Sequence, residues 1–324
     1  MARILSGMRP TGPLHIGHLV GALSNWRALQ EEYECFYMIA DWHALMSEYE
    51  DPSKIRQHAQ ECVADWIACG IDPDKSTMFV QSEVSEHAEL HLLLSTLVLL
   101  GRLERCPTYK EQLRELKGRN LATYGFLGYP VLQSSDILLY KAGVVPVGTD
   151  QLPHIEITRE IARKFNGLYG NVLVEPEAKL TETSRLLGLD RRKMSKSYDN
   201  TINLSEEPGL IRKRVASMFT DPERKRRNDP GRPDVCNVHS YFEVFAKKKA
   251  ANVAEECRAA TRGCTDCKAE LAEDLIEFLA PIRKKREEML ASGKVPEIIA
   301  AGRQKAAAVA GATLDEAMRA AGLR

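Results

Sequence analysis

The chain has 324 residues, of which 44% are hydrophobic and 28% charged, and 45 Lys and Arg residues balance 45 Asp and Glu residues. This composition is typical of a globular protein long enough for two domains, and a net charge of zero excludes a general polyanion binder. The first residues, MARILSGMRP, lack the apolar run of a secretory signal, and no apolar stretch reaches membrane-spanning length. We therefore expect a cytoplasmic protein without a membrane segment.

Strand and helix patterns alternate through the first eighty residues. The predicted elements are a strand at 3–5, a Gly/Pro-rich turn at 6–13, a helix at 16–26, a strand at 35–40, a helix at 52–69 and a strand at 77–80. The run at 35–40 is continuously apolar, which is typical of a strand buried on both faces. Strands that alternate with helices predict a doubly wound parallel sheet.

The rest of the chain is mainly helical. The predicted elements are helices over about 85–140 with a polar loop near 110–120, a strand at 144–147 and a helix at 151–166. After about residue 185 the strand patterns end, and from 201 onward the sequence is charged, Ala-rich and helical. We predict a Rossmann-like α/β domain at 1–190 with a helical insertion at about 85–140, a polar linker at 191–200, and an all-helical domain at 201–324. The last helix of that domain can pack back on the first domain.

His15, Gly17 and His18 stand at the start of the first predicted helix, directly after the Gly/Pro-rich turn. The first turn of a helix presents unpaired N–H groups and the positive end of its dipole, which favour phosphate. Gly17 lets a nucleotide ring lie against the backbone, and His15 and His18 share one helix face. We therefore predict a phosphate-binding segment, with two surface histidines beside an unrelated glycine as the alternative.

Lys193, Met194, Ser195, Lys196 and Ser197 form a second candidate segment. Two lysines and two hydroxyls on a loop suit a pyrophosphate leaving group, whose negative charge grows in the transition state. A solvated run of charges is the alternative for this segment alone. Its position downstream of the histidine segment favours nucleotide chemistry.

These two segments, His-Ile-Gly-His and Lys-Met-Ser-Lys-Ser, resemble the pair of motifs that defines class I aminoacyl-tRNA synthetases. Gly148-Thr149-Asp150-Gln151 resembles the Gly-x-Asp-Gln segment of the tryptophan and tyrosine subgroup, where these residues bind the ribose of ATP. The resemblance implies activation of an amino acid by ATP with Mg²⁺, transfer to tRNA, and a homodimer. It also implies that the first domain is catalytic and that the helical domain binds the tRNA anticodon.

The residues that the resemblance assigns fall into three sets. Those assigned to catalysis are Arg9, His15, His18, Lys193 and Lys196. Those assigned to ATP binding are Arg9, Pro10, Thr11, Gly17, His18, Gly148, Thr149, Asp150, Gln151, Leu186, Lys193, Met194, Ser195, Lys196 and Ser197. Those assigned to the amino acid are Leu5, Gly7, Tyr129, Gln133, Asp136, Val145 and Val147.

Few positions distinguish tryptophan from tyrosine as the substrate. Asp136 can accept a hydrogen bond from an indole N–H or from a phenol O–H, so this residue does not decide. Tyrosine enzymes typically hold the substrate hydroxyl with a tyrosine where this chain has Leu5, which makes no hydrogen bond. Leu5 and the Asp-Trp-His-Ala segment at 41–44 therefore resemble tryptophanyl-tRNA synthetases, which implies L-tryptophan, ATP and tRNA(Trp) as substrates. The alternatives are a tyrosyl enzyme, a small-molecule adenylyltransferase and a non-catalytic paralogue.

Three positions depart from the better-known tryptophanyl pattern. Many members have Thr-Ile-Gly-Asn in place of His-Ile-Gly-His, Gln in place of Arg9, and Met in place of Gln133. Arg9 would add a permanent positive charge near the α-phosphate of ATP. We therefore expect a distinct branch of the family.

Four of the eight cysteines, Cys236, Cys257, Cys264 and Cys267, lie close together in the helical part of the sequence. Without a secretory signal they are expected to be thiols or metal ligands rather than disulfides. Four thiolates suit zinc or an iron–sulfur cluster, but structural zinc usually takes two close pairs, and here one pair is close. The spacing resembles the [4Fe–4S] motif of a subset of bacterial tryptophanyl-tRNA synthetases. Zinc and four unrelated thiols remain the alternatives.

Overall fold

The protein is described by a computed structural model that covers residues 1–115, 121–180, 186–195 and 198–324. It forms two compact units. The sheet unit comprises Met1–Gly12, Asn25–Glu182 and Ser292–Arg324, and the helical unit comprises Pro13–Ser24 and Thr183–Ala291. The units divide the chain at other residues than the predicted domains do, because segment 13–24 joins the helical unit and the last helix joins the sheet unit. Within the described ranges, no helix is both long and apolar enough to cross a membrane.

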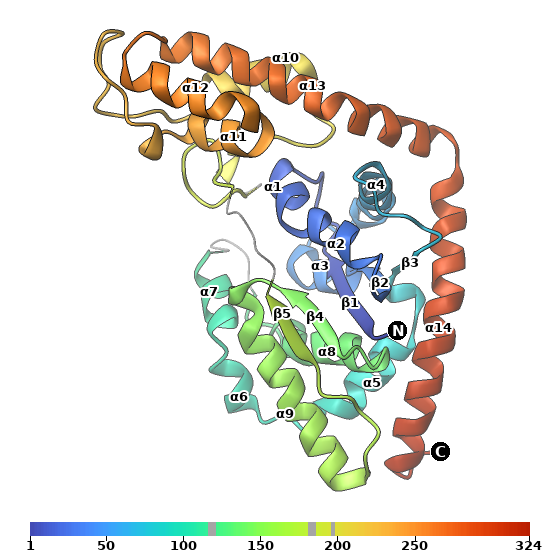
Figure 1. Ribbon diagram of the computed structural model, residues 1–324. Helices are drawn as coiled ribbons and strands as arrows, with labels where there is room; N and C mark the ends of the chain where they lie inside the picture. The colour runs from blue at the N-terminus through green and yellow to red at the C-terminus, as the bar shows by residue number, and fades with distance from the viewer. Residues whose placement is uncertain (116–120, 181–185, 196–197) are drawn as a thin grey trace. The chain divides into compact units, whose positions relative to one another are not determined.

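In the described part of the chain, five parallel strands form one sheet in the order β3-β2-β1-β4-β5. They are β1 (Arg3–Met8), β2 (Glu34–Ile39), β3 (Ser76–Val80), β4 (Val144–Val147) and β5 (Glu177–Leu180). The first strand stands in the middle, between β2 and β4, so the strand order reverses there (Figure 1). Ligands of doubly wound sheets bind outside the carboxyl ends of the strands at this reversal. The predicted α/β class is confirmed.

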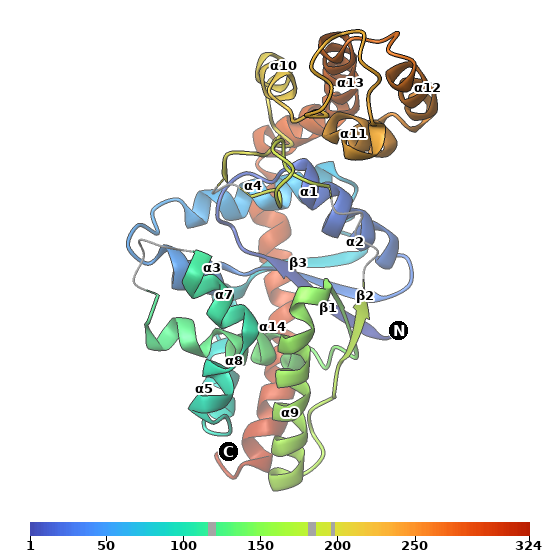
Figure 2. The same cartoon turned by 90° about the vertical axis from the view of Figure 1, so that its left-hand side faces the viewer.

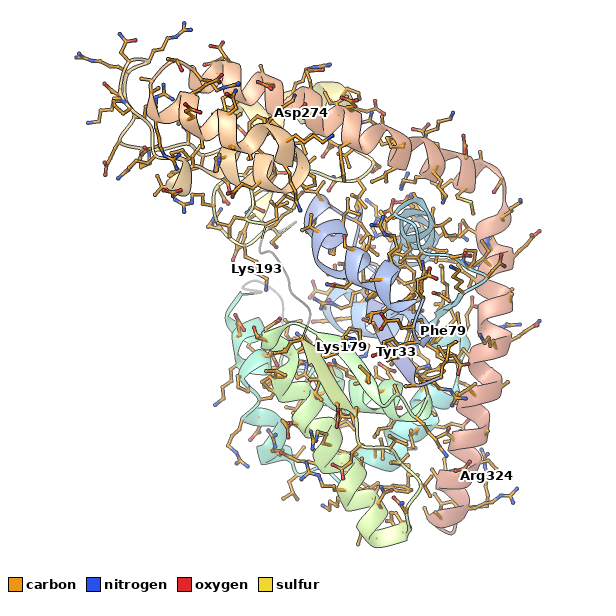
Figure 3. All side chains as sticks on the ribbon, in the orientation of Figure 1. Tyr33, Phe79, Lys179, Lys193, Asp274 and Arg324 are labelled. Atoms are coloured by element: carbon orange, nitrogen blue, oxygen red, sulfur yellow. The ribbon has the colours of Figure 1, made fainter. Side chains whose placement is uncertain are left out.

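Two details of the sheet differ from the prediction. Strand β1 continues to Met8, so the beginning of the predicted turn at 6–13 is wrong, and Gly7 pairs with Met38 of β2. Strand β5 has no counterpart among the predicted elements, because its sequence Glu-Ala-Lys-Leu is polar and mostly exposed at the sheet edge. Its Lys179 donates a hydrogen bond to Tyr33 at 3.2 Å, and the two side chains are labelled in Figure 3.

Helices of the sheet unit cover the sheet and extend beyond it. They are α3 (Asp41–Glu48), α4 (Ile55–Ala68), α5 (Glu86–Ser95), α6 (Leu100–Glu104), α7 (Pro107–Glu115), α8 (Tyr124–Leu139), α9 (Leu152–Tyr169) and α14 (Lys294–Ala320), with 3₁₀ turns η2 (Gln81–Glu83) and η3 (Thr149–Gln151) and helix α2 (Ser24–Leu29). The polar loop predicted near 110–120 is wrong up to residue 115, because α7 continues to Glu115. Its first residue is Pro107, and proline is tolerated in the first turn of a helix. Residues 116–120 lie outside the described ranges.

The last helix, α14, belongs to the core of the sheet unit. It packs against β3 and α5, and both views show it running beside the sheet (Figures 1 and 2). Its core residues are Ala306, Ala310, Leu314 and Ala317. At Gly302 an added Cβ would stand 1.8 Å from the carbonyl oxygen of Met78, so the helix backbone rests directly on the strand. Arg324, beyond the end of the helix, pairs with Glu89 of α5 at 3.1 Å.

The helical unit contains α1 (Ile16–His18), a π-helical turn η1 (Leu19–Leu23), α10 (Pro208–Ala216), a 3₁₀ turn η5 (Pro233–Val235), α11 (Asn237–Phe245), α12 (Lys247–Arg258) and α13 (Cys264–Ala291). Helices α10 and α11 pack on α13. The fully buried residues Tyr241, Phe242, Leu271 and Leu275 supply apolar packing there. The prediction of a helical C-terminal region is confirmed.

Candidate active site

The two motif segments belong to the helical unit and lie side by side. Helix α1 begins at Ile16, directly after His15, as predicted. Ile16 donates a backbone hydrogen bond to Ile202 (3.0 Å), and Leu204 donates one to Leu14 (2.8 Å), so the histidine segment pairs with the chain that follows the lysine segment. Tertiary pairing, rather than helix propensity alone, therefore holds this short helix.

Gly17 and Met194 form a direct contact between the motifs. A Cβ added at Gly17 would stand 2.9 Å from Nδ1 of His15 and 3.1 Å from Sδ of Met194. The rings of His15 and His18 lie 3.8 Å apart, and Nδ1 of His18 accepts a hydrogen bond from the backbone N–H of His15 at 3.1 Å. A neutral imidazole carries one proton, so this bond leaves the N–H of His18 on Nε2, where it can donate to an anion.

Asn200 fixes the base of the lysine segment. Its Oδ1 accepts from the backbone N–H of Ser195 (2.8 Å), and its Nδ2 donates to Asp190 (2.8 Å) and to the carbonyl of Lys193 (3.1 Å). The Lys193 side chain is exposed. Sequence reasoning missed Asn200, whose only signal is a polar side chain just after the motif. Lys196 and Ser197 lie outside the described ranges, and Leu186 is half-buried.

In the sheet unit, two glycines stand at or directly after neighbouring strands, where an added Cβ would meet other atoms of the protein. A Cβ at Gly7, near the end of β1, would stand 2.6 Å from the carbonyl oxygen of Met38. A Cβ at Gly148, directly after β4, would stand 2.6 Å from Oδ1 of Asp150. Asp150 itself is exposed. The predicted ribose-binding segment therefore lies at the carboxyl end of β4, beside the central strand where the strand order reverses.

The predicted residues of the amino-acid pocket divide into core and polar groups. Leu5, Val145 and Val147 are 3%, 4% and 8% exposed and belong to the core of the sheet unit. Tyr129 and Asp136 are 8% and 1% exposed, and Gln133 is half-buried between them on α8. One helix therefore carries the three polar residues, as their spacing predicts.

Arg9 follows β1 with Pro10 and Thr11. Pro10 is buried and Thr11 is half-buried, and the N–H of Thr11 bonds the carbonyl of Arg9 at 2.9 Å in a tight turn. The Arg9 side chain is exposed, yet nearby protein atoms partly desolvate the guanidinium and lower its pKa, against the opposing effects of Tyr129 and Glu48.

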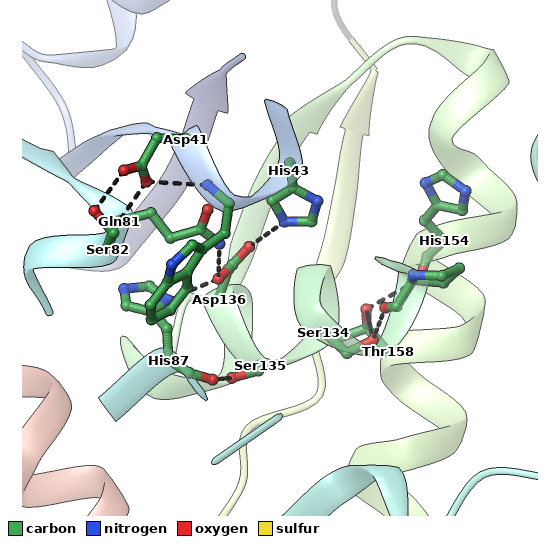
Figure 4. A network of polar contacts seen from close by, with 12 residues as sticks. Asp41, His43, Gln81, Ser82, His87, Ser134, Ser135, Asp136, His154 and Thr158 are labelled. Carbon is green, nitrogen blue, oxygen red and sulfur yellow. Dashed lines mark hydrogen bonds and ion pairs between the residues drawn. The ribbon is translucent and has the colours of Figure 1, made fainter. Parts of the chain in front are cut away.

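Asp136 is the centre of a buried polar network. Its Oδ1 accepts from Nε2 of Gln81 (2.8 Å) and from Nδ1 of His87 (2.7 Å), and its Oδ2 accepts from Nε2 of His43 (2.8 Å). Figure 4 shows these three side chains converging on the carboxylate from η2, α5 and α3. Nε2 of His87 lies 2.9 Å from the hydroxyl of Tyr140.

The network keeps Asp136 ionised. Burial alone would raise the pKa of this carboxyl, but the hydrogen bonds from His43 and His87 hold it well below its usual range. A carboxylate oxygen can accept about two hydrogen bonds, so Oδ1 is saturated. Among the contacts of the described residues, Oδ2 receives one, from His43, and keeps capacity for a further donor.

Sequence reasoning missed Gln81, His87 and His43 as site residues. His43 lies in the Asp-Trp-His-Ala segment directly after β2, at the carboxyl end of a strand, and this position was a usable signal. Gln81 likewise follows β3 immediately. His87 lies on α5, and nothing in its local sequence marks it.

Tyr129 takes part in a second buried network. Its hydroxyl donates to Oγ1 of Thr108 (3.0 Å) and lies 2.9 Å from Nε2 of His154, which Thr108 also contacts. Nδ1 of His154 lies 2.9 Å from Oε1 of Gln151, whose Nε2 donates to Asp150 at 3.2 Å. The residue predicted for the amino acid is thus connected to the pair predicted for ribose.

Comparison with known proteins identifies the family. Residues 1–280 match the family described as tRNA synthetases class I (W and Y). The chain is similar to a tryptophan–tRNA ligase of Thermotoga maritima, with 53% identity over 328 aligned positions that cover 99% of each chain. It is also similar to a tryptophan–tRNA ligase of Aquifex aeolicus, with 42% identity and coverage of 99% of this chain and 100% of the relative.

The chain belongs to the class I tryptophanyl- and tyrosyl-tRNA synthetase family.

A solved structure of the same family supports the fold of this synthetase. The tryptophanyl-tRNA synthetase from Campylobacter jejuni, solved in complex with ADP and tryptophan, has a TM-score of 0.91 and 34% identity. The alignment covers 99% of this synthetase and 100% of that chain. The predicted class I synthetase fold is confirmed.

The four late cysteines of this synthetase share one neighbourhood in the helical unit. Nη1 of Arg224 lies 3.7 Å from Sγ of Cys257 and 3.8 Å from Sγ of Cys264. Burial raises the pKa of Cys267 to about 12, and the other three thiols, including Cys236, add to that rise. The four thiols are therefore near neighbours.

The described residues do not show the predicted metal site. Among the described residues, no group of three or more His, Cys, Asp or Glu side chains is arranged to hold a metal ion. The guanidinium of Arg224 instead donates to two sulfurs and to the carbonyls of Arg227 (2.9 Å) and Arg262 (2.7 Å). Burial raises the pKa of Cys257, and the positive charge of Arg224 opposes that rise.

We expect His154 to make the stability of this synthetase depend on pH. Burial lowers the pKa of His154 from 6.5 to about 4. Between these values the unfolded state binds the proton and the folded state does not, so stability falls as the pH is lowered from 6.5 to 4. The loss across this window is about 3 kcal/mol.

Urea unfolding of the wild type and of His154→Asn at pH 7, 5.5 and 4.5 measures this effect. The variant should lose less stability over the same interval. Protonation of Asp136 does not interfere, because its lowered pKa in the folded protein means that the stability it contributes is lost only below pH 3.8. Equal pH dependence in the two proteins would contradict the assignment to His154.

Proposed function

We propose that this synthetase activates L-tryptophan with ATP, releases pyrophosphate, and transfers the tryptophanyl group to the 3′ end of tRNA(Trp). The observation that carries the choice of tryptophan is the combination of the buried acceptor Asp136 with the buried Leu5, which offers no partner for a substrate hydroxyl. The indole N–H is a donor only, so it needs the acceptor Oδ2 of Asp136 and no second polar partner. The relatives with 53% and 42% identity that are named tryptophan–tRNA ligases support the same reaction.

The apolar residues favour indole over phenol. A phenol hydroxyl both donates and accepts, so a site for tyrosine needs a second polar partner. Leu5 offers none, and Val145 and Val147 are apolar as well. Their place in the core holds them in fixed positions, which suits a rigid wall for a flat ring. Since tryptophan is the largest natural side chain, a close pocket excludes the others by size without an editing site.

The chemistry needs positioning and charge stabilisation rather than a covalent enzyme intermediate. The carboxylate of tryptophan attacks the α-phosphorus of ATP in line, forming tryptophanyl-adenylate as pyrophosphate leaves. We assign His15, His18 and Arg9 to the α-phosphate. The N–H that the histidine geometry leaves on Nε2 of His18 suits a phosphate oxygen.

The remaining roles follow the two motif segments and the strand ends. We assign Lys193, Ser195 and Lys196 to the departing pyrophosphate; Mg²⁺, when bound, neutralises part of its charge. Asp150 and Gln151 are assigned to the ribose, and Gly7 and Gly17 to close packing of adenosine. The assigned residues that complete the ATP set are Pro10, Thr11, Gly148, Thr149, Leu186, Met194 and Ser197. Tyr129 and Gln133 are assigned to the amino group.

Amino-acid-dependent ATP–pyrophosphate exchange tests the proposal, with tryptophan and tyrosine measured in parallel. We expect exchange with tryptophan and none above background with tyrosine. Exchange with tyrosine would overturn the role of Leu5 and Asp136 while keeping the family. No exchange with either amino acid would favour a non-catalytic paralogue.

We further propose that the helical unit binds the anticodon of the tRNA and that two copies of the chain form a cytoplasmic dimer. Lys225, Arg226 and Arg227 are consecutive exposed cations on a chain without net charge, which suits a local contact with phosphates.

The proposed dimer rests on apolar residues of the sheet unit. There, Leu92, Leu99 and Leu100 are 62–75% exposed, which suits an apolar contact between subunits.

We also propose that Cys236, Cys257, Cys264 and Cys267 hold a [4Fe–4S] cluster. Their donor chemistry fits, because thiolates are the ligands of such clusters. Arg224, which contacts two of the sulfurs, fits as well, because its positive charge would offset part of the negative charge of four thiolates. A bound cluster would require the thiols to turn inward and lose their protons. Zinc is the competing occupant.

We expect anaerobically purified protein to be brown and to contain about four irons per chain. Elemental analysis and visible absorption measure both. Cys264→Ala should lose the iron and the colour, whereas Cys69→Ala, which removes a buried thiol from the sheet unit, should keep them. Colourless wild-type protein with one zinc per chain would contradict the cluster.

A further inference from the structure

A line of hydrogen bonds inside the sheet unit connects Tyr129 to Asp150. It runs from the Tyr129 hydroxyl to Thr108 (3.0 Å), from Thr108 to Nε2 of His154, from Nδ1 of His154 to Gln151 (2.9 Å), and from Gln151 to Asp150 (3.2 Å). His154 is 1% exposed, Thr108 6% and Tyr129 8%, so water does not compete for the inner bonds.

The acidic end fixes the direction of the hydrogen bonds from Asp150 to His154. A carboxylate only accepts, so the amide of Gln151 must turn its NH₂ group toward Asp150 and its oxygen toward His154. Since that oxygen only accepts, Nδ1 of His154 must carry the ring proton. The pKa of His154 is lowered by burial to about 4, so the ring is neutral at pH 7 and Nε2 is left as an acceptor.

The same logic extends to Tyr129. Nε2 of His154 accepts a hydrogen bond from the hydroxyl of Thr108 or of Tyr129, and the Tyr129 hydroxyl donates to Oγ1 of Thr108 or to Nε2 of His154, inward in both cases. With its proton directed into the protein, the phenol oxygen presents only lone pairs on its other side. It is then an acceptor, which suits a cationic ammonium group and repels no part of it.

We infer that His154 is a positioning residue that holds Tyr129 as a hydrogen-bond acceptor for the ammonium group of the amino acid, and ties this acceptor to the ribose-binding pair Asp150 and Gln151. The inference rests on the proposed function. His154 lies in none of the motif segments and is assigned no contact with the substrate, so its role is to orient Tyr129. The direction of the hydrogen bonds between Asp150 and Tyr129 then determines how the ammonium group is recognised.

A pair of ligands isolates the ammonium contact. L-Tryptophan and indole-3-propionate share the indole and the carboxylate, but indole-3-propionate has no ammonium group. Isothermal titration calorimetry gives the Kd of each ligand, and the ratio of the two Kd values measures ammonium recognition. A structural defect in the pocket weakens both ligands and leaves the ratio unchanged.

Two variants of His154 and one control variant separate the roles of the two ring nitrogens of His154. His154→Asn keeps an amide near the position of Nδ1 but removes the acceptor toward Thr108 and Tyr129. His154→Gln can place its carbonyl oxygen near the position of Nε2 and restore that acceptor. Thr158→Val is the matched control, because Thr158 lies one turn further along α9 and is fully buried, and among the described residues its hydroxyl bonds Ser134 and the backbone of His154.

We expect the wild type and Thr158→Val to prefer tryptophan over indole-3-propionate by the same ratio. His154→Asn should reduce that ratio by ~10-fold, the effect of losing one charged hydrogen bond, with little change for indole-3-propionate. His154→Gln should recover most of the ratio. An unchanged ratio in His154→Asn, or an equal weakening of both ligands, would overturn the inference while leaving the proposed function intact. A wild type that binds neither ligand would overturn the proposed function itself.

Discussion

Replacing Asp136 with Asn is expected to lower kcat/KM for tryptophan activation by roughly a thousandfold. The carboxylate accepts hydrogen bonds from His43, His87 and Gln81, and its remaining acceptor capacity faces no described partner. An amide in its place turns an NH₂ group toward at least one of these donors. The variant therefore loses the indole contact and also leaves buried donors unpaired, and both effects add to the barrier.

A substrate analogue distinguishes loss of the indole contact from general damage. β-(Benzothiophen-3-yl)alanine replaces the indole N–H with sulfur and keeps the ring shape. Pyrophosphate exchange should show the wild type discriminating strongly between tryptophan and this analogue, and Asp136→Asn treating them nearly alike. If the variant still favours tryptophan as much as the wild type does, the indole N–H is bound elsewhere. Circular dichroism of the variant checks that the fold is kept.

The second large effect is expected at Gly302, where Gly302→Ala should destabilise the protein by about 3 kcal/mol. An added Cβ would stand 1.8 Å from the carbonyl oxygen of Met78, and the obstacle is strand backbone rather than a flexible side chain. Either α14 moves away from β3 or the strand bends, and both changes open the core that Ala306 and Ala310 fill. Urea unfolding curves measure the shift in free energy of unfolding.

Gly311→Ala provides the matched control on the same helix. Its added Cβ would lie 3.5 Å from the carboxylate of Glu86, an ordinary contact. Alanine is a better helix former than glycine, so this variant should gain about 1 kcal/mol. Opposite signs for the two substitutions would identify contact with β3 as the cause. A comparable gain at Gly302 would show that α14 does not rest on the strand as described.

Much of the fold could be predicted from local patterns. Apolar runs mark β2 and β3 because strands buried on both faces have no polar alternation. The edge strand β5 could not be found this way, because its polar residues face solvent. The membership of α14 in the sheet unit follows from packing against β3, and its Ala-rich sequence fits many partners equally well. Long-range packing, not local propensity, decides such cases.

The candidate site shows the same division. The spacing of Tyr129, Gln133 and Asp136 predicts one helix face, and the structure has them on α8. The residues that set the chemistry of that face, His87 and His154, come from α5 and α9 and meet α8 only through tertiary packing. A histidine in a helix carries no local mark of the acid or hydroxyl that it will contact. The partners of a predicted residue are therefore harder to predict than the residue itself.

The membership of α14 in the sheet unit also has a consequence for the order in which the chain is made. Strand β3 and helix α5 leave the ribosome early, but the helix that covers them is translated only after the whole helical unit. During synthesis the helical unit can complete its own core, whereas the sheet unit waits with an uncovered apolar surface until α14 has been made. A chain that stops before α14 would thus present that surface to chaperones.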